Sequence, residues 1–246
     1  MNILDALEKK QLLLHYQPIV DLQQHSAPVV GYEALLRCKC PDRGFLLPKD
    51  FLPSITQAKI TDFKWQTPLF NWVFTEACKT AATLEDGLYL SVNVEPMQFL
   101  EAGFVARVKQ TIEQLNLKGR ICFEITEHSI ASRDLLVLQQ ELTLLTESAK
   151  IALDDVWTGN ASLWRISELY GLIDFLKIDR VFMPKDSFDR KSIAIFRCFV
   201  TLADALDLQT VAEGIETRQQ VDFCRSLGVR FAQGFFFGKA QAELAQ

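Results

Sequence analysis

Residues 151–162, IALDDVWTGNAS, decide how the fold of this chain is interpreted. An apolar run from Ile151 to Leu153 ends in two adjacent aspartates, Asp154 and Asp155. A strand that is apolar on both faces is typical of a parallel sheet covered by helices. Carboxylates at the end of such a strand indicate a site, because burying a lone carboxylate costs several kcal/mol unless something compensates its charge.

The same pattern, a short β-rich run followed by a stretch with helical periodicity, recurs along the chain. The predicted strands lie at 12–20, 29–37, 88–94, 120–126, 150–154, 173–179, 208–213 and 229–234. The predicted helices lie at 48–58, 62–82, 100–116, 131–147, 161–169, 190–206 and 216–227. Seven or eight strands that alternate with helices favour a closed α/β barrel of the TIM-like (β/α)8 class over an open sheet. The Gly-rich phosphate-binding loops of open nucleotide-binding sheets are also missing from the sequence.

Composition predicts an ordinary globular domain. The 246 residues are 49% hydrophobic and 23% charged and contain no linker-like stretch, so we expect a single domain over 1–246. The net charge of -5 argues against a protein that binds DNA, RNA or a membrane surface, since these need a basic stripe. The sequence contains no secretory signal and no membrane segment, which favours a cytoplasmic protein.

The cysteines and histidines are interpreted as structural. The six cysteines lie scattered, mostly among apolar neighbours. Cys38 and Cys40 form a CxC pair, but no second pair and no histidine lies near them in the sequence. The three histidines show no metal-ligand spacing. Small buried thiols in a reduced cytosol are therefore favoured over a metal or redox site.

Barrel enzymes build their sites at the C-terminal ends of the strands, and polar residues gather at those ends in this sequence. In strand order they are Glu33, Asn93, Glu124, Glu127, Asp154, Asp155, Lys177, Asp179, Glu213, Glu216 and Gln233. One acidic residue after a strand is more often a helix cap or a solvated loop residue. Acidic residues at five strand ends need a shared counter-charge, and Mg²⁺ or Mn²⁺ prefers such oxygen ligands. The lysine is then either an ion-pair partner or a group that orients or deprotonates a metal-bound water.

Eight motifs in register resemble the EAL domain family. They are QPIV at 17–20, YEALLR at 32–37, SVNVEP at 91–96, FEITE at 123–127, ALDD at 152–155, LKIDR at 176–180, VAEGIET at 211–217 and QGFFFGK at 233–239. Each motif alone is weak, but eight in order, over roughly residues 7–240, are specific. The resemblance implies a TIM-like barrel whose first strand runs antiparallel to the others. It also implies a phosphodiesterase that hydrolyses cyclic di-GMP to linear pGpG with two Mg²⁺ or Mn²⁺ ions.

The resemblance further implies a role for each matching residue. The implied ligands of the first metal are Glu33, Asn93, Glu124 and Asp154. The implied ligands of the second metal are Asp154, Asp155 and Glu213. The implied catalytic residues are Lys177, which positions or deprotonates the attacking water, Glu213, and Glu127, which supports the loop after Asp155. The implied substrate-binding residues are Gln17, Leu36, Arg37, Asp179, Glu216 and Gln233.

The loop after Asp155 departs from the family pattern. Where the family has DDFGTGYSS, this chain has DDVWTGNAS, so Val156 and Trp157 replace a Phe-Gly pair and Asn160 replaces a tyrosine. If the glycine position requires a positive φ, a tryptophan there costs about 1–2 kcal/mol.

Three functions therefore stay open. They are an active phosphodiesterase, a cyclic di-GMP receptor with little hydrolysis because of the altered loop 156–160, and a nucleotide-independent protein-interaction module. The complete set of matching metal and lysine positions favours the first. The resemblance also implies a homodimer, an expectation to which the substitutions in the loop run counter.

Overall fold

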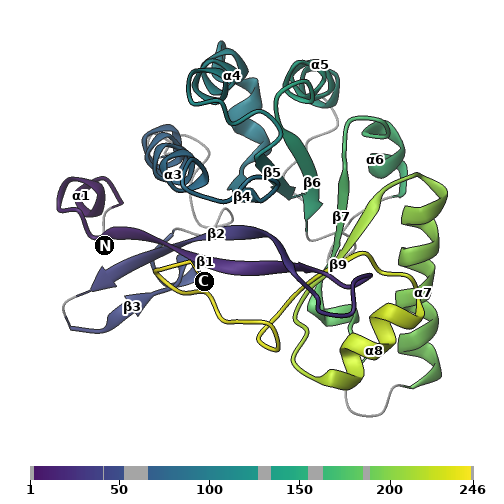
Figure 1. The fold of residues 1–246 in the computed structure, drawn as a ribbon. Helices are drawn as coiled ribbons and strands as arrows, with labels where there is room; N and C mark the ends of the chain where they lie inside the picture. The colour runs from purple at the N-terminus through teal and green to yellow at the C-terminus, as the bar shows by residue number, and fades with distance from the viewer. Residues whose placement is uncertain are drawn as a thin grey trace.

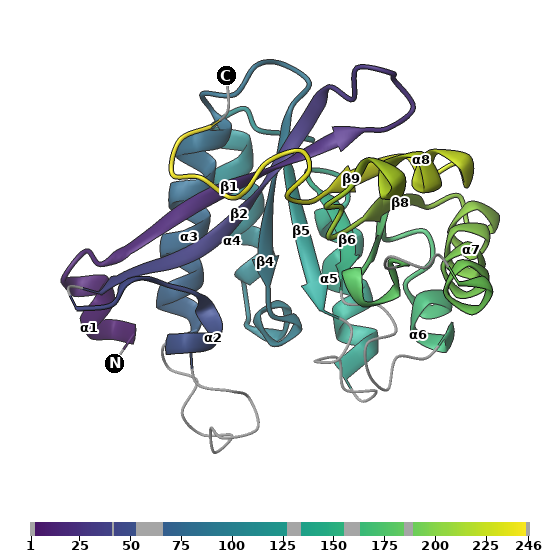
Figure 2. The ribbon, with the colours of Figure 1, turned by 90° about the horizontal axis from the view of Figure 1, so that it is seen from below.

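The computed structural model describes residues 3–40, 42–52, 66–126, 134–154, 163–184 and 189–244. Within these residues, eight strands form a barrel with helices on its outside (Figures 1 and 2). The barrel strands are β1 (Leu12–Asp21), β2 (Val29–Cys40), β4 (Tyr89–Val94), β5 (Ile121–Thr126), β6 (Lys150–Asp154), β7 (Phe175–Ile178), β8 (Gln209–Ala212) and β9 (Phe231–Gln233). A further short strand, β3 (Gly44–Leu46), pairs antiparallel with the last three residues of β2 and is not part of the barrel.

One barrel strand runs against the others, as the resemblance implies. β1 pairs antiparallel with both of its neighbours, β2 and β9, and the pairing of β1 with β2 closes the ring. The remaining neighbours, from β2 through β4 to β9, pair in parallel. The prediction of a TIM-like barrel with an antiparallel first strand is therefore confirmed. The parallel strands consequently present their C-terminal ends on one face of the barrel.

The helices lie in an arc around the strands (Figure 1). They are α3 (Gln66–Ala81), α4 (Phe104–Gln114), α5 (Leu135–Leu145), α6 (Leu163–Glu168), α7 (Arg190–Ala205) and α8 (Arg218–Ser226). Shorter helices are α1 (Ile3–Glu8), α2 (Pro48–Phe51) and the 3-10 helices η2 (Pro96–Leu100) and η5 (Arg180–Phe182). No described helix is both long enough and apolar enough to cross a membrane.

Two helix predictions need correction. The helix predicted over 48–58 ends at Phe51, where Leu52 adopts an extended conformation with φ -78 and ψ 133. The next residue in the sequence is a proline, which disfavours helical backbone in the residue before it. The helix predicted over 100–116 begins only at Phe104, after Gly103 adopts a left-handed conformation with φ 77.

Helix α7 illustrates how the sequence sets local structure. The Asp189 carboxylate accepts hydrogen bonds from the backbone N–H groups of Lys191 and Ser192, both at 3.0 Å. These bonds satisfy donors that have no partner inside the first turn of a helix. Phe196, Val200 and neighbouring apolar residues at helical spacing then bury one face of α7 in the core. The helix is thereby fixed against the outside of the barrel.

Apolar side chains fill the barrel below its C-terminal end. The members of this inner cluster are Ile19, Tyr89, Cys122, Ala152, Phe175, Val211 and Phe231. The rings of Tyr89 and Phe175 stack with centroids 5.7 Å apart, and Phe231 meets Phe175 edge-on at 5.8 Å. All six cysteines of the chain are free thiols. The interior of the barrel is therefore filled by apolar side chains, and the polar residues discussed below lie nearer the C-terminal ends of the parallel strands.

Candidate active site

Lys177 lies among carboxylates at the C-terminal end of the barrel. Its Nζ lies 2.7 Å from Glu124, 2.8 Å from Glu213, 3.2 Å from Asp154 and 3.7 Å from Glu33. Lys177 is on β7, Glu33 on β2, Glu124 on β5 and Asp154 at the end of β6, while Glu213 directly follows β8. We call this group of four carboxylates around Lys177 the carboxylate cage. The closed barrel thus gathers residues that lie far apart in the sequence.

The carboxylate cage is largely shielded from water. The exposed fraction is 1% for both Lys177 and Glu124, 6% for Glu33 and 9% for Asp154, whereas the Glu213 side chain is 19% exposed and lies at the open side of the cage. When all groups are ionised, four carboxylates face one ammonium group, which leaves three negative charges in excess. Such an excess of buried charge is costly unless protons or further cations compensate it.

The pKa values of the cage reflect this excess of negative charge. Burial, together with the neighbouring carboxylates, raises the pKa of Glu213 to about 8 against the opposing effect of Lys177. Burial and the charge of Glu33 hold the pKa of Glu124 well above its usual range. Burial alone would lower the pKa of Lys177, but the four carboxylates outweigh it and raise that pKa well above its ordinary value. Lys177 therefore stays an ammonium group.

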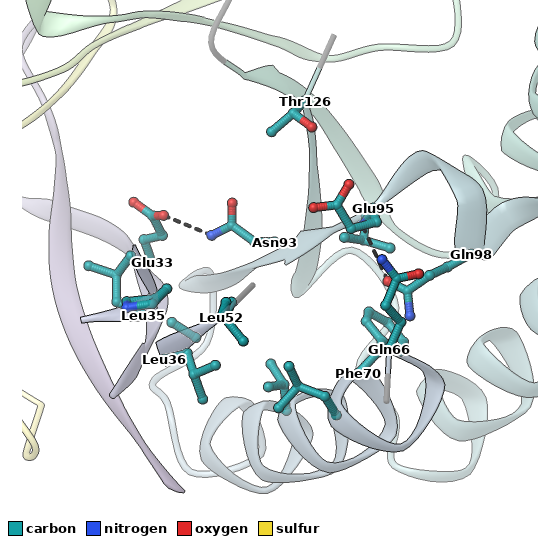
Figure 3. A pocket seen from close by; sticks show the side chains of 15 residues that line it. Glu33, Leu35, Leu36, Leu52, Gln66, Phe70, Asn93, Glu95, Gln98 and Thr126 are labelled. Carbon is teal, nitrogen blue, oxygen red and sulfur yellow. Dashed lines mark hydrogen bonds between the residues drawn. The ribbon is translucent and has the colours of Figure 1, made fainter. Parts of the chain in front are cut away.

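Two side-chain amides hold Glu33 in place. Asn93 Nδ2 donates a hydrogen bond to Glu33 Oε1 at 3.0 Å (Figure 3), and Gln233 Nε2 donates to Glu33 Oε2 at 2.7 Å. Gln233 Nε2 also donates to Gln17 Oε1 at 3.1 Å, and Gln17 Nε2 donates to the Gly238 carbonyl at 3.1 Å. Burial raises the pKa of Glu33, but Lys177 and these amides outweigh that effect and lower it. Glu33 is therefore an ionised carboxylate held in one orientation.

Two cavities flank Glu33, and both include Glu33 and Leu35 in their linings. The first, which we call the apolar cavity, has a volume of about 380 Å³. Its lining includes Leu36, Leu52, Leu69, Phe70, Val73, Asn93, Glu95, Gln98 and Thr126 (Figure 3). The second, the polar cavity, has a volume of about 220 Å³. Its lining includes Gln17, Asp179, Arg180, Glu213, Glu216, Gln233 and Phe235.

Most of the residues singled out from the sequence gather around these cavities. The carboxylate cage, Asn93, Gln17 and Gln233 form one contact network, and Leu36 lines the apolar cavity. Arg37 lines neither cavity; its Nη1 donates a hydrogen bond to the Leu36 carbonyl at 2.8 Å. Glu127, Asp155 and the loop 156–160 lie outside the described residues.

Asp179 and Glu216 line the polar cavity without joining the cage. The Asp179 carboxylate accepts a hydrogen bond from the backbone N–H of Val181 at 2.6 Å and begins the short helix η5. Within the part of the chain that the structure describes, it forms no ion pair with Lys177. Asp179 therefore lies at the polar cavity and outside the ion pairs of the cage.

Phe235 and Arg180 line the polar cavity, although the sequence reasoning did not single them out. Both lie inside quoted motifs, Phe235 in QGFFFGK and Arg180 in LKIDR. The signal that could have identified Phe235 is its place directly after Gln233 and Gly234, at the end of a barrel strand. An aromatic residue at that point lies at the mouth of the barrel, where packing does not require it.

The donor set of the cage fits a hard divalent cation. It offers carboxylate oxygens, an amide oxygen from Asn93, and an excess of buried negative charge. The buried Oε1 of Gln233 has no hydrogen-bond partner among the described residues. No three acidic, histidine or cysteine side chains of the described chain already converge on one metal-sized point, since Lys177 lies between the carboxylates.

Residues 1–240 of the chain match the family model of the EAL domain. The bifunctional diguanylate cyclase/cyclic di-GMP phosphodiesterase MucR of Pseudomonas aeruginosa is 35% identical over 246 residues, which cover 97% of this chain and 34% of that protein. The cyclic di-GMP phosphodiesterase PdeR of Escherichia coli is 31% identical over 248 residues, covering 99% of this chain and 36% of PdeR. The chain thus spans about a third of the length of these relatives.

Solved structures agree in fold over nearly the whole chain. The PaMucR phosphodiesterase in complex with c-di-GMP has a TM-score of 0.82 and 32% identity, and the match covers 98% of both chains. The EAL enzyme Bd1971, in its cAMP and cyclic-di-GMP bound form, has a TM-score of 0.85 and 31% identity. That match covers 97% of this chain and 64% of Bd1971.

Proposed function

The chain belongs to the EAL domain family, and on that premise we propose that it hydrolyses cyclic di-GMP to linear pGpG with divalent metal ions. The observation that carries the proposal is the carboxylate cage, in which Lys177 meets four carboxylates from β2, β5, β6 and the residue that follows β8. The names of MucR and PdeR as cyclic di-GMP phosphodiesterases support it. So does the c-di-GMP complex of the MucR phosphodiesterase.

Two Mg²⁺ or Mn²⁺ ions are part of the proposal. Glu33, Asn93, Glu124 and Asp154 would hold the first ion, and Asp154, Asp155 and Glu213 would hold the second. When bound, such ions polarise a phosphodiester and make a bound water more acidic. The excess negative charge of the cage supports this assignment, because the same carboxylates without cations would repel an anionic substrate.

In this proposal Lys177 acts on the attacking water, and Glu33 is held in place as a metal ligand. Lys177 positions or deprotonates the attacking water, from a place where its Nζ lies within 3.2 Å of Glu124, Glu213 and Asp154. Gln17 and Gln233 keep the Glu33 carboxylate turned toward the cage. The roles of Glu127 and Asp155 stay predictions.

The presence of two cavities supports a substrate that carries two bases. Cyclic di-GMP has two guanines on opposite sides of a central phosphodiester ring. Placing one scissile phosphodiester over the cage directs one guanine toward the apolar cavity and the other toward the polar cavity. Leu36 would contact the first, and Asp179 and Glu216 the second. A phosphate contact by Arg37, a homodimer and a cytoplasmic location stay predictions.

Adding Mg²⁺ or Mn²⁺ to the EDTA-treated protein is expected to raise its Tm. An ion present at about 100 times its Kd stabilises the folded state by about 2.7 kcal/mol, which corresponds to roughly 5–10 °C for a chain of this size. Differential scanning calorimetry measures the shift. Asp154→Asn, which removes a charged ligand of both ions, should show a much smaller shift. An equal shift in that variant would contradict the assigned ligands.

Gln233→Ala is expected to lower kcat/KM for cyclic di-GMP by about 10- to 100-fold, as is typical when a group that holds a metal ligand is removed. The reason is that Glu33 loses the 2.7 Å hydrogen bond that fixes its Oε2. Steady-state kinetics measures the effect. Gln209→Ala, which changes an exposed glutamine on β8, is the matched control. A rate equal to that of the control would mean that Gln233 does not position Glu33.

The proposed function itself is tested by incubating the protein with cyclic di-GMP and Mg²⁺ or Mn²⁺, and separately with cyclic di-AMP. We expect chromatography to detect pGpG from the first substrate and far less product from the second. Binding of cyclic di-GMP without any product over hours would reject hydrolysis and leave a receptor. Absence of both binding and product would leave the protein-interaction module.

A further inference from the structure

Glu213 is the one carboxylate of the cage that belongs to a loop. The other three lie within β2, β5 and β6, whereas Glu213 directly follows β8. Its side chain is also the most exposed of the four. The 2.8 Å contact between Glu213 and Lys177 Nζ therefore depends on how the loop after β8 is held.

The loop after β8 packs against the end of β7 and the residues that follow it. The backbone N–H of Glu213 donates to the carbonyl of Ile178, the last residue of β7, at 3.0 Å. The next residue, Gly214, has φ 65, a left-handed conformation that favours glycine. A Cβ at Gly214 would collide with the Cβ of Arg180 and would lie 3.3 Å from its Cδ. Glycine at this position therefore provides both the backbone conformation and the space for Arg180.

The turn after β9 holds the same loop from its other side. The N–H of Ile215 donates to the Gln233 carbonyl at 3.1 Å, and the N–H of Phe236 donates to the Ile215 carbonyl at 2.9 Å. Gly234 lies so close to this loop that a Cβ added there would collide with the backbone of Ile215. Residues 213–215 are thus held between the segments that follow β7 and β9, so an atom added at Gly214 must displace one of its neighbours.

The surroundings of Gly214 differ from those of most other glycines with a positive φ. Five of these among the described residues have φ between 71 and 90 and no heavy atom within 4 Å of an added Cβ: Gly44, Gly87, Gly119, Gly171 and Gly228. Glycine serves only the backbone conformation at those five positions. At Gly214 it also permits the close approach of Arg180, and this approach joins the loop of Glu213 to the strand of Lys177.

We propose, on the basis of the proposed function, that Gly214 is a positioning residue whose contact with Arg180 sets the place of the Glu213 carboxylate in the cage. Gly214 acts through the residue before it and not on the reacting atoms. A methyl group at position 214 would push the loop away from Arg180, and Glu213 would move with the loop. A displacement of about 1 Å in a catalytic group can cost about 100-fold in rate.

The test is Gly214→Ala, measured by calorimetric titration with Mn²⁺ and by kcat for cyclic di-GMP. We expect the Kd for Mn²⁺ to rise and kcat to fall, each by about 10- to 100-fold, the range typical when a metal ligand loses its support. Gly228→Ala is the matched control, because Gly228 has φ 81 but nothing within 4 Å of an added Cβ. This control carries similar backbone strain and should keep the wild-type values of both.

Substitutions at Arg180 test the contact itself. Arg180→Gly removes the Cβ that an alanine at position 214 would meet, whereas Arg180→Ala keeps it. Adding Gly214→Ala should therefore cost little in the Arg180→Gly background and the full effect in the Arg180→Ala background. Equal costs in both backgrounds, or wild-type Mn²⁺ affinity in Gly214→Ala, would overturn the positioning role. If Gly214→Ala does not fold, recovery by Arg180→Gly but not by Arg180→Ala supports the role, and recovery by neither overturns it.

Failure of the proposed function is seen separately, as a wild-type protein that forms no pGpG. A crystal structure of Gly214→Ala tests the positioning role in that case too, because it needs no turnover. We expect the distance from Lys177 Nζ to the Glu213 carboxylate to exceed its present 2.8 Å by about 1 Å or more. An unchanged distance would reject the positioning role whatever the activity.

Discussion

Replacing Lys177 with methionine is expected to lower the free energy of unfolding of the metal-free protein by about 3–5 kcal/mol, the cost typical of breaking a buried ion pair from one side. The physical reason is that Lys177 is the counter-charge of the whole cage, with carboxylate oxygens at 2.7, 2.8 and 3.2 Å from its Nζ. Without it, buried carboxylates repel one another. Urea unfolding in EDTA at constant pH measures the difference.

Two comparisons make the Lys177 prediction specific. Lys79→Met removes a lysine whose ion pair with Glu76 is exposed, so we expect a loss of no more than about 1 kcal/mol. Adding Mg²⁺ or Mn²⁺ should recover part of the stability of Lys177→Met, because divalent ions then compensate the same carboxylates. A loss as small as that of Lys79→Met would mean that the cage does not depend on Lys177 for its charge balance.

Replacing Glu33 with glutamine is expected to lower kcat for cyclic di-GMP hydrolysis by about 10³-fold or more, equivalent to about 4 kcal/mol of transition-state stabilisation. Glutamine keeps the size of the side chain but removes a negative charge from the proposed metal ligands. Its amide also cannot accept at both positions where Asn93 and Gln233 now donate. Turnover measured at saturating substrate and metal reports the loss.

The control for Glu33 is Glu76→Gln, a like substitution on the exposed face of α3. We expect it to leave kcat unchanged. Binding of cyclic di-GMP to Glu33→Gln should persist, since both cavities keep most of their lining. If Glu33→Gln retained more than about a tenth of the wild-type kcat, the cage would not be the catalytic centre.

The sequence predicted the barrel because each strand carries its own local signal. A run such as Ile151–Leu153 is apolar on both faces, and the polar residue that follows marks the end of the strand. The antiparallel first strand came from the family resemblance, since periodicity gives no direction. The strand β3 and the helix α1 were not predicted, because both are short, at 3 and 6 residues, and lie outside the regular alternation of strands and helices on which the prediction relied.

The candidate site was predictable in its members but not in its arrangement. Acidic residues on several strands indicated a shared cation, and the structure places the Lys177 ammonium group among four of these residues, one of which, Glu33, lies in the middle of β2 and not at its end. A sequence pattern does not predict these distances, because they depend on the register between strands, which decides which residues of different strands lie at the same height along the barrel axis. The same holds for Gln17, whose link to Gln233 joins the first strand to the last.

Phe235 illustrates the remaining gap between sequence and structure. Among the chain's 18 phenylalanines, most stand where an apolar side chain is expected, so the sequence alone gives no reason to choose one. Its exposure and its place in the polar cavity distinguish it only once the fold is known. Burial and cavity lining are properties of the folded chain, so a sequence pattern alone does not reveal them.

The proposed function depends above all on metal-dependent hydrolysis of cyclic di-GMP at the carboxylate cage. The most direct measurement is chromatographic detection of pGpG formed by the wild-type protein and by Glu33→Gln, each with Mn²⁺ and each with EDTA. We expect pGpG from the wild-type protein with Mn²⁺ and essentially none from the other three samples. Equal amounts of pGpG with and without EDTA, or from both proteins, would contradict it.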